Sequence, residues 1–156
     1  MIWPNDLTSL ILAAVFGAAI GFERELSGKA AGLRTNLLIC LGATVFTIIS
    51  QEMAKNADGS VTRIAAQIVT GVGFLGAGAI IQDRGGVHGL TTAATIWLVA
   101  SIGMACGARF YLLATIATAI TIVVLVGLGK LSRRVDRYRE ERRQTKSTDE
   151  SDQEPI

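Results

Sequence analysis

Five apolar segments without a charged residue run through this chain, and short polar stretches separate them. They cover residues 7–22, 35–51, 64–82, 90–108 and 110–129. In a helix that rises about 1.5 Å per residue, each segment is long enough, or nearly so, to cross the roughly 30 Å hydrocarbon core of a bilayer. The pattern therefore predicts five transmembrane helices. The first segment is the shortest, so it requires a path without tilt or a locally thinner bilayer.

Composition supports a membrane protein, because half of the 156 residues are hydrophobic and 17 are glycine. Soluble domains of this size rarely have such a composition. We expect an all-α fold, a polytopic membrane helix bundle of about five transmembrane helices. Its domains would be a transmembrane domain over 1–129, a basic juxtamembrane helix on the inner leaflet over 130–146, and a disordered acidic tail over 147–156.

The distribution of Lys and Arg predicts the orientation of the bundle. Five spans place the two termini on opposite sides, and basic residues collect in cytoplasmic loops. With the N-terminus outside, only Lys55, Arg63 and Arg109 of the 15 basic residues lie on the outer side. The start of the chain, 1–6, has no basic residue and does not resemble the start of a signal peptide. We therefore expect an outside N-terminus and a cytoplasmic C-terminus.

Two stretches of the sequence resemble each other. GAAIGFERELSGKAAGLRT begins at Gly17, and GAGAIIQDRGGVHGLTT begins at Gly76. Each contains the end of an apolar helix, a charged loop, a Gly-Leu dipeptide and then a threonine. Because both loops fall on the cytoplasmic side, helices 1–2 and 3–4 would form a parallel internal repeat, and substrate sites often lie where such repeats meet. Thr35 and Thr92 end the two motifs, where a hydroxyl either caps the next helix or lines a site.

Glycines recur at helical spacing inside the apolar segments. Spaced GxxxG motifs let transmembrane helices approach closely. A GxGxxG pattern over 71–76 and Gly78 suggests dinucleotide binding elsewhere, but here no strand precedes it and the expected acidic residue is missing. Tight helix packing, or local unwinding beside a pore, fits this setting better. The predicted helix-packing glycines are Gly17, Gly21, Gly71, Gly73, Gly76, Gly78, Gly103 and Gly107.

Charged residues next to the hydrocarbon are costly and mark pairing or function. Glu23, Arg24 and Glu25 directly follow the first apolar segment. A carboxylate at a helix C-terminus faces the negative pole of the helix dipole and needs a compensating cation. A neighbouring basic residue such as Arg24 would supply it. A hydrated Mg²⁺ would also do so, because one or two carboxylates suffice for this ion, with Glu23 beside Glu25 or Asp83 as the metal ligands.

Other catalytic or binding chemistry is sparse. The sequence has no Walker A motif, no metalloprotease motif and no serine nucleophile elbow, which excludes an ATP-driven pump made of this chain alone. We expect no enzymatic activity, no cofactor apart from Mg²⁺, and no nucleic-acid partner. His88 stands alone and is expected to be solvated. Cys40 and Cys106 are expected at different depths in the membrane and therefore unbonded.

Several motifs in a fixed order resemble one protein family. IGFERE begins at Ile20, AGLRT ends at Thr35, RIAAQIVTGVGFLGAGAI begins at Arg63, and GLTTAATIW ends at Trp97. Together they are similar to the MgtC/SapB family of bacterial inner-membrane proteins, over about residues 7–128. The resemblance implies a protein tied to magnesium limitation and, in pathogens, to survival inside host cells. It also implies partners in the membrane, namely the F-type ATP synthase or transporters. Apart from the resemblance, we also expect a homo-oligomer.

Carried across by position, the family's polar motif residues give the candidate ligand- or partner-binding residues. They are Glu23, Arg24, Arg34, Thr35, Arg63, Gln67, Thr91 and Thr92. For Gln67, a hydrogen bond between helices is the simpler role. Virulence-associated members have Asn at the position of Thr91 and Cys at that of Leu98, so their specific activity is not implied. Many members also have a soluble C-terminal domain, which we do not expect here.

Two functions from different classes remain. The first is a regulator that modulates membrane energetics or a partner complex through helix contacts. The second is a transporter or channel that passes Mg²⁺ or another ion at the interface of the repeats. If the second is right, Glu23→Gln abolishes ion flux. If the first is right, substitutions at Gly17, Gly21, Gly103 and Gly107 disrupt association with the partner.

Overall fold

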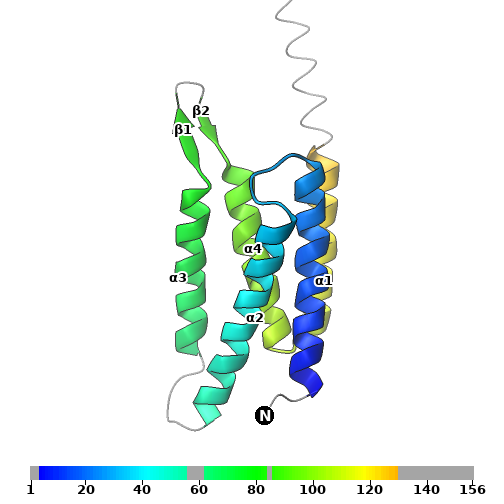
Figure 1. Ribbon diagram of the computed structural model, residues 1–156, viewed down its shortest axis with the longest axis vertical. Helices are drawn as coiled ribbons and strands as arrows, with labels where there is room; N and C mark the ends of the chain where they lie inside the picture. The colour runs from blue at the N-terminus through cyan, green and yellow to red at the C-terminus, as the bar shows by residue number, and fades with distance from the viewer. Residues whose placement is uncertain (1–3, 56–61, 84–85, 130–156) are drawn as a thin grey trace, which may run out of the picture. The chain divides into compact units, whose positions relative to one another are not determined.

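The structure is a computed structural model that describes residues 4–55, 62–83 and 86–129. Helix α1 (Pro4–Leu26) is followed by α2 (Leu33–Lys55), α3 (Thr62–Gly78), strands β1 (Ile81–Asp83) and β2 (Gly86–His88), and α4 (Leu90–Gly107) (Figure 1). A further helix covers Tyr111–Gly129. The predicted all-α membrane bundle is confirmed, because four of these helices are long and apolar enough to span a bilayer.

The chain divides into two compact units, Met1–Ile122 and Val123–Ile156. The arrangement described below is that of the first unit. Within the second unit, the described residues up to Gly129 are helical. The basic helix predicted over 130–146 and the acidic tail predicted over 147–156 lie outside the described residues.

Helices α1 to α4 alternate in direction, so the loop between α1 and α2 lies at the same end of the bundle as the β-hairpin (Figure 1). We call this end, formed by residues 26–33, 79–83 and 86–90, the hairpin end, and the other the N-terminal end. Helix α2 packs against both α1 and α4, and α3 packs against α4 and α2. This order places the polar ends of α1 and α2 beside each other.

The third apolar segment differs from its prediction. It was expected to be helical as far as Gln82, but α3 ends at Gly78 and the chain continues into β1. Two hydrogen bonds, Ala79 N–H to the Gly76 carbonyl and Ile80 N–H to the Ala77 carbonyl, tighten the last turn. A charge-free run does not distinguish a helix end from a following strand, so hydropathy alone merged the two. Helix α3 is correspondingly short, with 17 residues from Thr62 to Gly78.

The bundle has small and polar residues inside and large apolar residues outside. Ser9, Asn36 and Thr44 are fully buried. Phe74 on α3 is 81% exposed and Leu112 is 75% exposed. Such a distribution suits lipid, where outer apolar side chains need no cover and small residues let helices pack closely.

The glycines of α1 and α4 lie in close helix contacts. A Cβ atom built on Gly17 would lie 2.8 Å from Cys40 Cβ, and one on Gly21 would lie 2.8 Å from Leu33 Cα. Gly107 is equally close to α2, with its built Cβ 2.7 Å from the Thr44 carbonyl oxygen, and a Cβ on Gly103 would collide with the Cys40 carbonyl. These four positions pack as their motifs predicted.

The glycines of α3 behave differently. Gly76 is in ordinary contact with Ala93, but a Cβ built on Gly71, Gly73 or Gly78 meets no atom within 4 Å. The close packing predicted for these three positions is therefore not made within the described part of the chain. The alternative prediction of local unwinding is wrong, because α3 is a continuous helix from Thr62 to Gly78.

The two similar motifs do place equivalent residues at helix starts. Leu33 begins α2 and Leu90 begins α4, each directly after a glycine. The prediction that Thr92 caps its helix is wrong, because Gly89 occupies the cap position without a side-chain hydrogen bond and Thr92 is buried inside α4. Thr35 likewise lies within α2. The parallel repeat of whole helix pairs stays a prediction.

Candidate functional site: a buried arginine at the hairpin end

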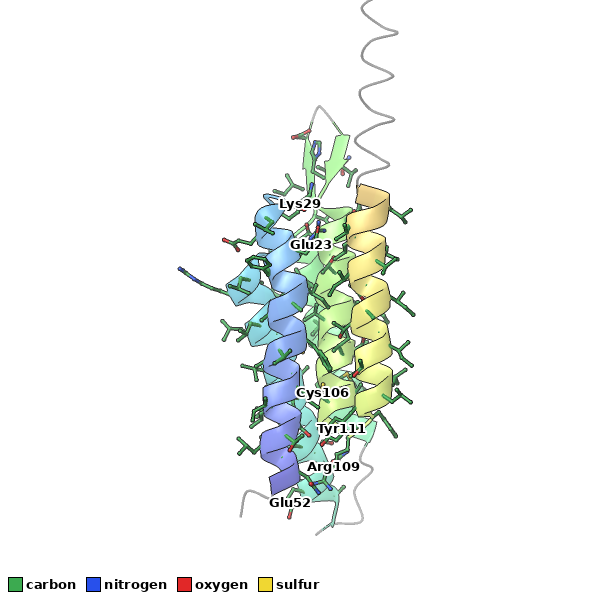
Figure 2. All side chains as sticks on the ribbon, turned by 90° about the vertical axis from the view of Figure 1, so that its right-hand side faces the viewer. Glu23, Lys29, Glu52, Cys106, Arg109 and Tyr111 are labelled. Carbon is green, nitrogen blue, oxygen red and sulfur yellow. The ribbon has the colours of Figure 1, made fainter. Side chains whose placement is uncertain are left out.

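The candidate site is the junction where α1 ends and α2 begins. Gly28 adopts a left-handed conformation with φ +64°, which lets the chain leave the helix sharply. The N–H groups of Gly28 and Lys29 then bond the carbonyls of Glu25 and Arg24, each at 3.0 Å. Glu23 and Lys29 mark this end of the bundle in Figure 2. We call residues 21–36 the α1–α2 junction.

Arg24 is buried at this junction and forms an ion pair with its neighbour. Only 4% of the residue is exposed. Its Nε lies 2.9 Å from Glu23 Oε2, and the Ser27 hydroxyl donates to Glu23 Oε1 at 2.8 Å. A buried charge is tolerated only when it is paired. Arg24 thus supplies the positive charge that compensates the Glu23 carboxylate. This is the first of the two interpretations drawn from the sequence, a neighbouring basic residue, and the second was a bound Mg²⁺.

Glu25 has a separate role, since it faces α2 and not Glu23. Its Oε2 accepts a hydrogen bond from the Leu33 backbone N–H at 2.9 Å. A carboxylate at a helix N-terminus interacts favourably with the helix dipole. Gly32 leaves the space for this contact, because a Cβ at that position would collide with the Glu25 carboxylate. Glu25 therefore caps α2.

Asn36 is a functional candidate that the sequence analysis missed. It is fully buried, and its Nδ2 donates to the carbonyls of Ala31 at 2.7 Å and Gly32 at 2.8 Å. These two bonds fix the orientation of the amide, so Oδ1 must be the free acceptor. Asn36 Oδ1 and Arg24 Nη1 are both buried without a hydrogen bond to any described residue. The same holds for Glu23 Oε2 and Arg24 Nε, which form an ion pair at 2.9 Å but are not aligned for a hydrogen bond. An amide within an apolar segment was the signal that could have identified it.

Of the remaining predicted site residues, only Arg34 and Thr35 belong to this junction, and the others lie on α3 and α4. Arg34, Thr35 and Thr91 are exposed, and Thr92 is buried. Gln67 is exposed on α3, and Arg63 lies in the same helix with a side chain outside what the structure describes. Among the described side chains of this set, the structure pairs Glu23 with Arg24. Asn36 is a further buried polar residue of the same junction.

The tentative metal ligands are also separate. Asp83 pairs with His88 across the hairpin, with Oδ1 and Nε2 3.5 Å apart and both side chains more than half exposed. Glu23 is engaged by Arg24 and Glu25 by the start of α2. In the part of the chain that the structure describes, no three His, Cys, Asp or Glu side chains are grouped to hold a metal ion. A Mg²⁺ site with only one or two carboxylate ligands from the protein stays a prediction.

A second polar cluster, at the N-terminal end of the bundle, links the first turns of α1 to the turn after α4. Arg109 has a positive φ of 66° and its Nη2 lies 3.1 Å from Asp6 Oδ1. The Tyr111 hydroxyl lies 3.0 Å from Ser9 Oγ and donates to the Asn5 carbonyl at 3.2 Å. Arg109 and Tyr111 lie together at this end in Figure 2. These bonds fix the turn after α4 to the first turns of α1.

A pocket of about 540 Å³ lies between α2 and α3. We call it the α2–α3 groove. Its lining includes Leu38, Gly42 and Phe46 from α2, and Gln67, Gly71 and Leu75 from α3. Among the described residues that line the groove, Gln67 has the one polar side chain and none is charged.

Comparison with known proteins identifies relatives over most of this chain. A family model described as "MgtC family" matches residues 10–134. "Protein MgtC" of Brucella abortus (strain 2308) is 46% identical over 127 residues, which cover 80% of this chain and 52% of the relative. "Putative magnesium transporter YhiD" of Escherichia coli (strain K12) is 44% identical over 132 residues, 81% of this chain and 61% of the relative.

"Protein MgtC" of Salmonella typhimurium (strain 14028s / SGSC 2262) is 42% identical over 130 residues, 83% of this chain and 55% of the relative. The matched region is therefore little more than half the length of these relatives. No solved structure matches the chain.

Proposed function

The chain belongs to the MgtC family, and on this premise we propose that it is a non-enzymatic inner-membrane protein, linked to magnesium limitation, that modulates a partner membrane complex. By family resemblance, the partner classes are the F-type ATP synthase and other transporters. We propose the N-terminus outside and the C-terminus in the cytoplasm.

The observation that carries this proposal is the closed interior of the bundle. At Gly21 and Gly103 the backbone of one helix lies directly against α2, which leaves no passage between them. Mg²⁺ gives up its hydration waters reluctantly, so a path for it must admit water as well. At the hairpin end Arg24 engages the Glu23 carboxylate at 2.9 Å, so this carboxylate is not free to bind an approaching cation. Each feature favours a regulator over an ion path.

The closed interior also changes where a partner would bind. Gly17, Gly21, Gly103 and Gly107 all face α2, so substitutions there disturb the fold of the chain itself and not its association with another protein. A partner contact must use the outer apolar surface, where Phe22, Leu112 and similar side chains are exposed.

The decisive experiment measures Mg²⁺ flux into proteoliposomes that contain the purified full chain. A membrane potential is imposed in both directions, and Glu23→Gln is the matched variant. We expect flux no higher than in protein-free vesicles at either potential, with no difference between wild type and variant. Flux that wild type supports and Glu23→Gln abolishes would overturn the regulator proposal.

A second experiment tests the partner directly. A photo-crosslinking residue at Leu112, which is 75% exposed, is compared with one at Ile102, which is 1% exposed. We expect the Leu112 position to give adducts with a subunit of another membrane complex in magnesium-limited cells, and the Ile102 position to give none. Adducts with lipid alone from the exposed position would contradict the proposal.

The alternative function is a transporter or channel for Mg²⁺ or another ion, with its path at the repeat interface. The buried Arg24 Nη1 and Asn36 Oδ1 support it, because polar atoms without a bond to a described residue often contact a ligand. The name of the YhiD relative, "Putative magnesium transporter", points the same way. The flux measurement separates the two functions.

A further inference from the structure

In the part of the chain that the structure describes, the buried side-chain atoms without a hydrogen-bond partner gather at one place. They are Glu23 Oε2, Arg24 Nε, Arg24 Nη1 and Asn36 Oδ1, and all four belong to the α1–α2 junction. Deeper in the bundle, the buried Thr44 hydroxyl bonds two backbone carbonyls, at 2.9 and 2.8 Å. Because a buried polar group without a partner is costly, the four atoms at the junction require an explanation.

The unpartnered atoms come from both helices of the junction. A Cβ built on Gly21 would lie 3.1 Å from Asn36 Cβ, so the Asn36 side chain lies against α1 at this level. Arg24 follows Gly21 by three residues and therefore lies on the same face of α1. Side chains of a helix lean toward its N-terminus, which brings the Arg24 side chain back toward the level of Gly21. The two buried side chains thus belong to one part of the α1–α2 interface.

These atoms are balanced in charge and in hydrogen-bonding type. The Glu23 carboxylate and the Arg24 guanidinium, 2.9 Å apart, compensate each other in charge. Glu23 Oε2 and Asn36 Oδ1 are acceptors, and the two Arg24 nitrogens are donors. An anion would satisfy the donors alone, a metal ion would satisfy the acceptors alone, and each would add an uncompensated charge to a buried site. A neutral ligand that both donates and accepts satisfies both kinds of atom.

We infer that the α1–α2 junction binds ordered water, which accepts a hydrogen bond from Arg24 Nη1 and donates one to Asn36 Oδ1. Water is the smallest neutral ligand with both properties, and a buried water bonds about three polar groups that have no other partner. The junction is then a hydration site at the end of a bundle whose helices otherwise touch through glycines. This inference is independent of the proposed function, because it requires neither ion flux nor a partner protein.

Proton-detected solid-state NMR of the full chain in lipid bilayers tests this site. Magnetisation is transferred from water to the isotope-labelled protein, and its rate of arrival is measured at single N–H groups. We expect transfer to the Arg24 Nε–H and to the Asn36 side-chain amide to be several-fold faster than to the backbone N–H of Ile102, which is 1% exposed. Equal rates at the three positions would overturn the inference.

A pair of variants tests whether Asn36 holds the water beside Arg24. In Asn36→Leu, which lacks the acceptor, we expect transfer from water to the Arg24 Nε–H to fall several-fold. Thr44→Val is the matched control, because Thr44 is also fully buried on α2 but its hydroxyl is bonded to protein carbonyls. Unchanged transfer at Arg24 in a folded Asn36→Leu variant would refute the shared water. If this variant does not fold, the wild-type rates still decide.

Titration of the same sample distinguishes water from a charged ligand. Inorganic phosphate is the probe for an anion site and Mg²⁺ the probe for a cation site. We expect neither ion to shift the side-chain signals of Arg24 or Asn36. A saturable shift of the Arg24 signals with phosphate would assign an anion site, and one of the Asn36 signals with Mg²⁺ would assign a cation site. Either result would overturn the water site.

Discussion

At the scale of single residues, the contact between α1 and α2 depends on glycines that touch backbone. A Cβ on Gly21 would lie 2.8 Å from Leu33 Cα and 2.9 Å from the Leu33 carbonyl oxygen. Backbone atoms cannot rotate away as the end of a long side chain can. Leu33 also begins α2 and receives the Glu25 cap, so a shift there would disturb the α1–α2 junction as well.

We therefore expect Gly21→Ala to lower the free energy of unfolding by about 1–3 kcal/mol, the usual cost of overpacking. The control is Gly73→Ala, where the added methyl group meets no atom within 4 Å. Alanine favours a helix over glycine, so we expect this variant to be as stable as wild type or up to about 1 kcal/mol more stable. Unfolding titrations in detergent followed by circular dichroism measure both. Equal stability of the two variants would contradict the packing described here.

Individual residues were predictable from sequence where their partners lie on the same motif. The GxxxG spacing of Gly17 and Gly21 indicated a close contact, and Arg24 beside Glu23 indicated an ion pair. Asn36 was not predictable, because its amide bonds the carbonyls of Ala31 and Gly32, and these point toward it only after the loop has turned. The path of a loop is not encoded in hydropathy.

At the scale of elements, the two loops of the hairpin end depend on glycine for different reasons. Gly28 and Gly89 both have positive φ, +64° and +88°. At Gly28 no atom lies within 4 Å of a built Cβ, whereas at Gly89 a Cβ would collide with the Ala79 carbonyl. Gly28 thus needs only its backbone conformation, and Gly89 also needs the space that allows β2 to lead into α4.

This difference predicts unequal effects of the same substitution. We expect Gly28→Ala to cost about 1–2 kcal/mol, the penalty for a left-handed residue with a Cβ. Gly89→Ala should cost clearly more, because the steric clash adds to the same penalty. Thermal unfolding of the two purified variants measures this order. A Gly89→Ala variant more stable than Gly28→Ala would show that the hairpin does not hold this close contact.

The elements were predicted well where apolar runs end at charged residues. The boundaries of α1, α2, α4 and the last described helix lie within a few residues of the expected ones. The β-hairpin was missed, because its strands of three residues are too short for a period of two to appear in the sequence. Its turn was expected only as a charged loop.

At the scale of the whole molecule, charge and topology together predict which end faces the cytoplasm. Lys29 belongs to the hairpin end, and Arg24 and Arg34 lie beside it in the sequence. Lys29 and Arg34 are exposed. At the N-terminal end, Arg109 is paired with Asp6 and thus partly neutralised. Basic residues favour the cytoplasmic side, so we expect the hairpin end there.

Single cysteines at Lys29 and Glu52 test this orientation, because both residues are exposed and they lie at opposite ends of the bundle (Figure 2). We expect a membrane-impermeant maleimide to modify Glu52→Cys in intact spheroplasts and Lys29→Cys only in inside-out vesicles. Wild type, whose Cys40 and Cys106 are buried, is the unlabelled control. Labelling of Lys29→Cys from outside would reverse the orientation. The α1–α2 junction would then lie on the outer side of the membrane, where a cytoplasmic partner could not reach it.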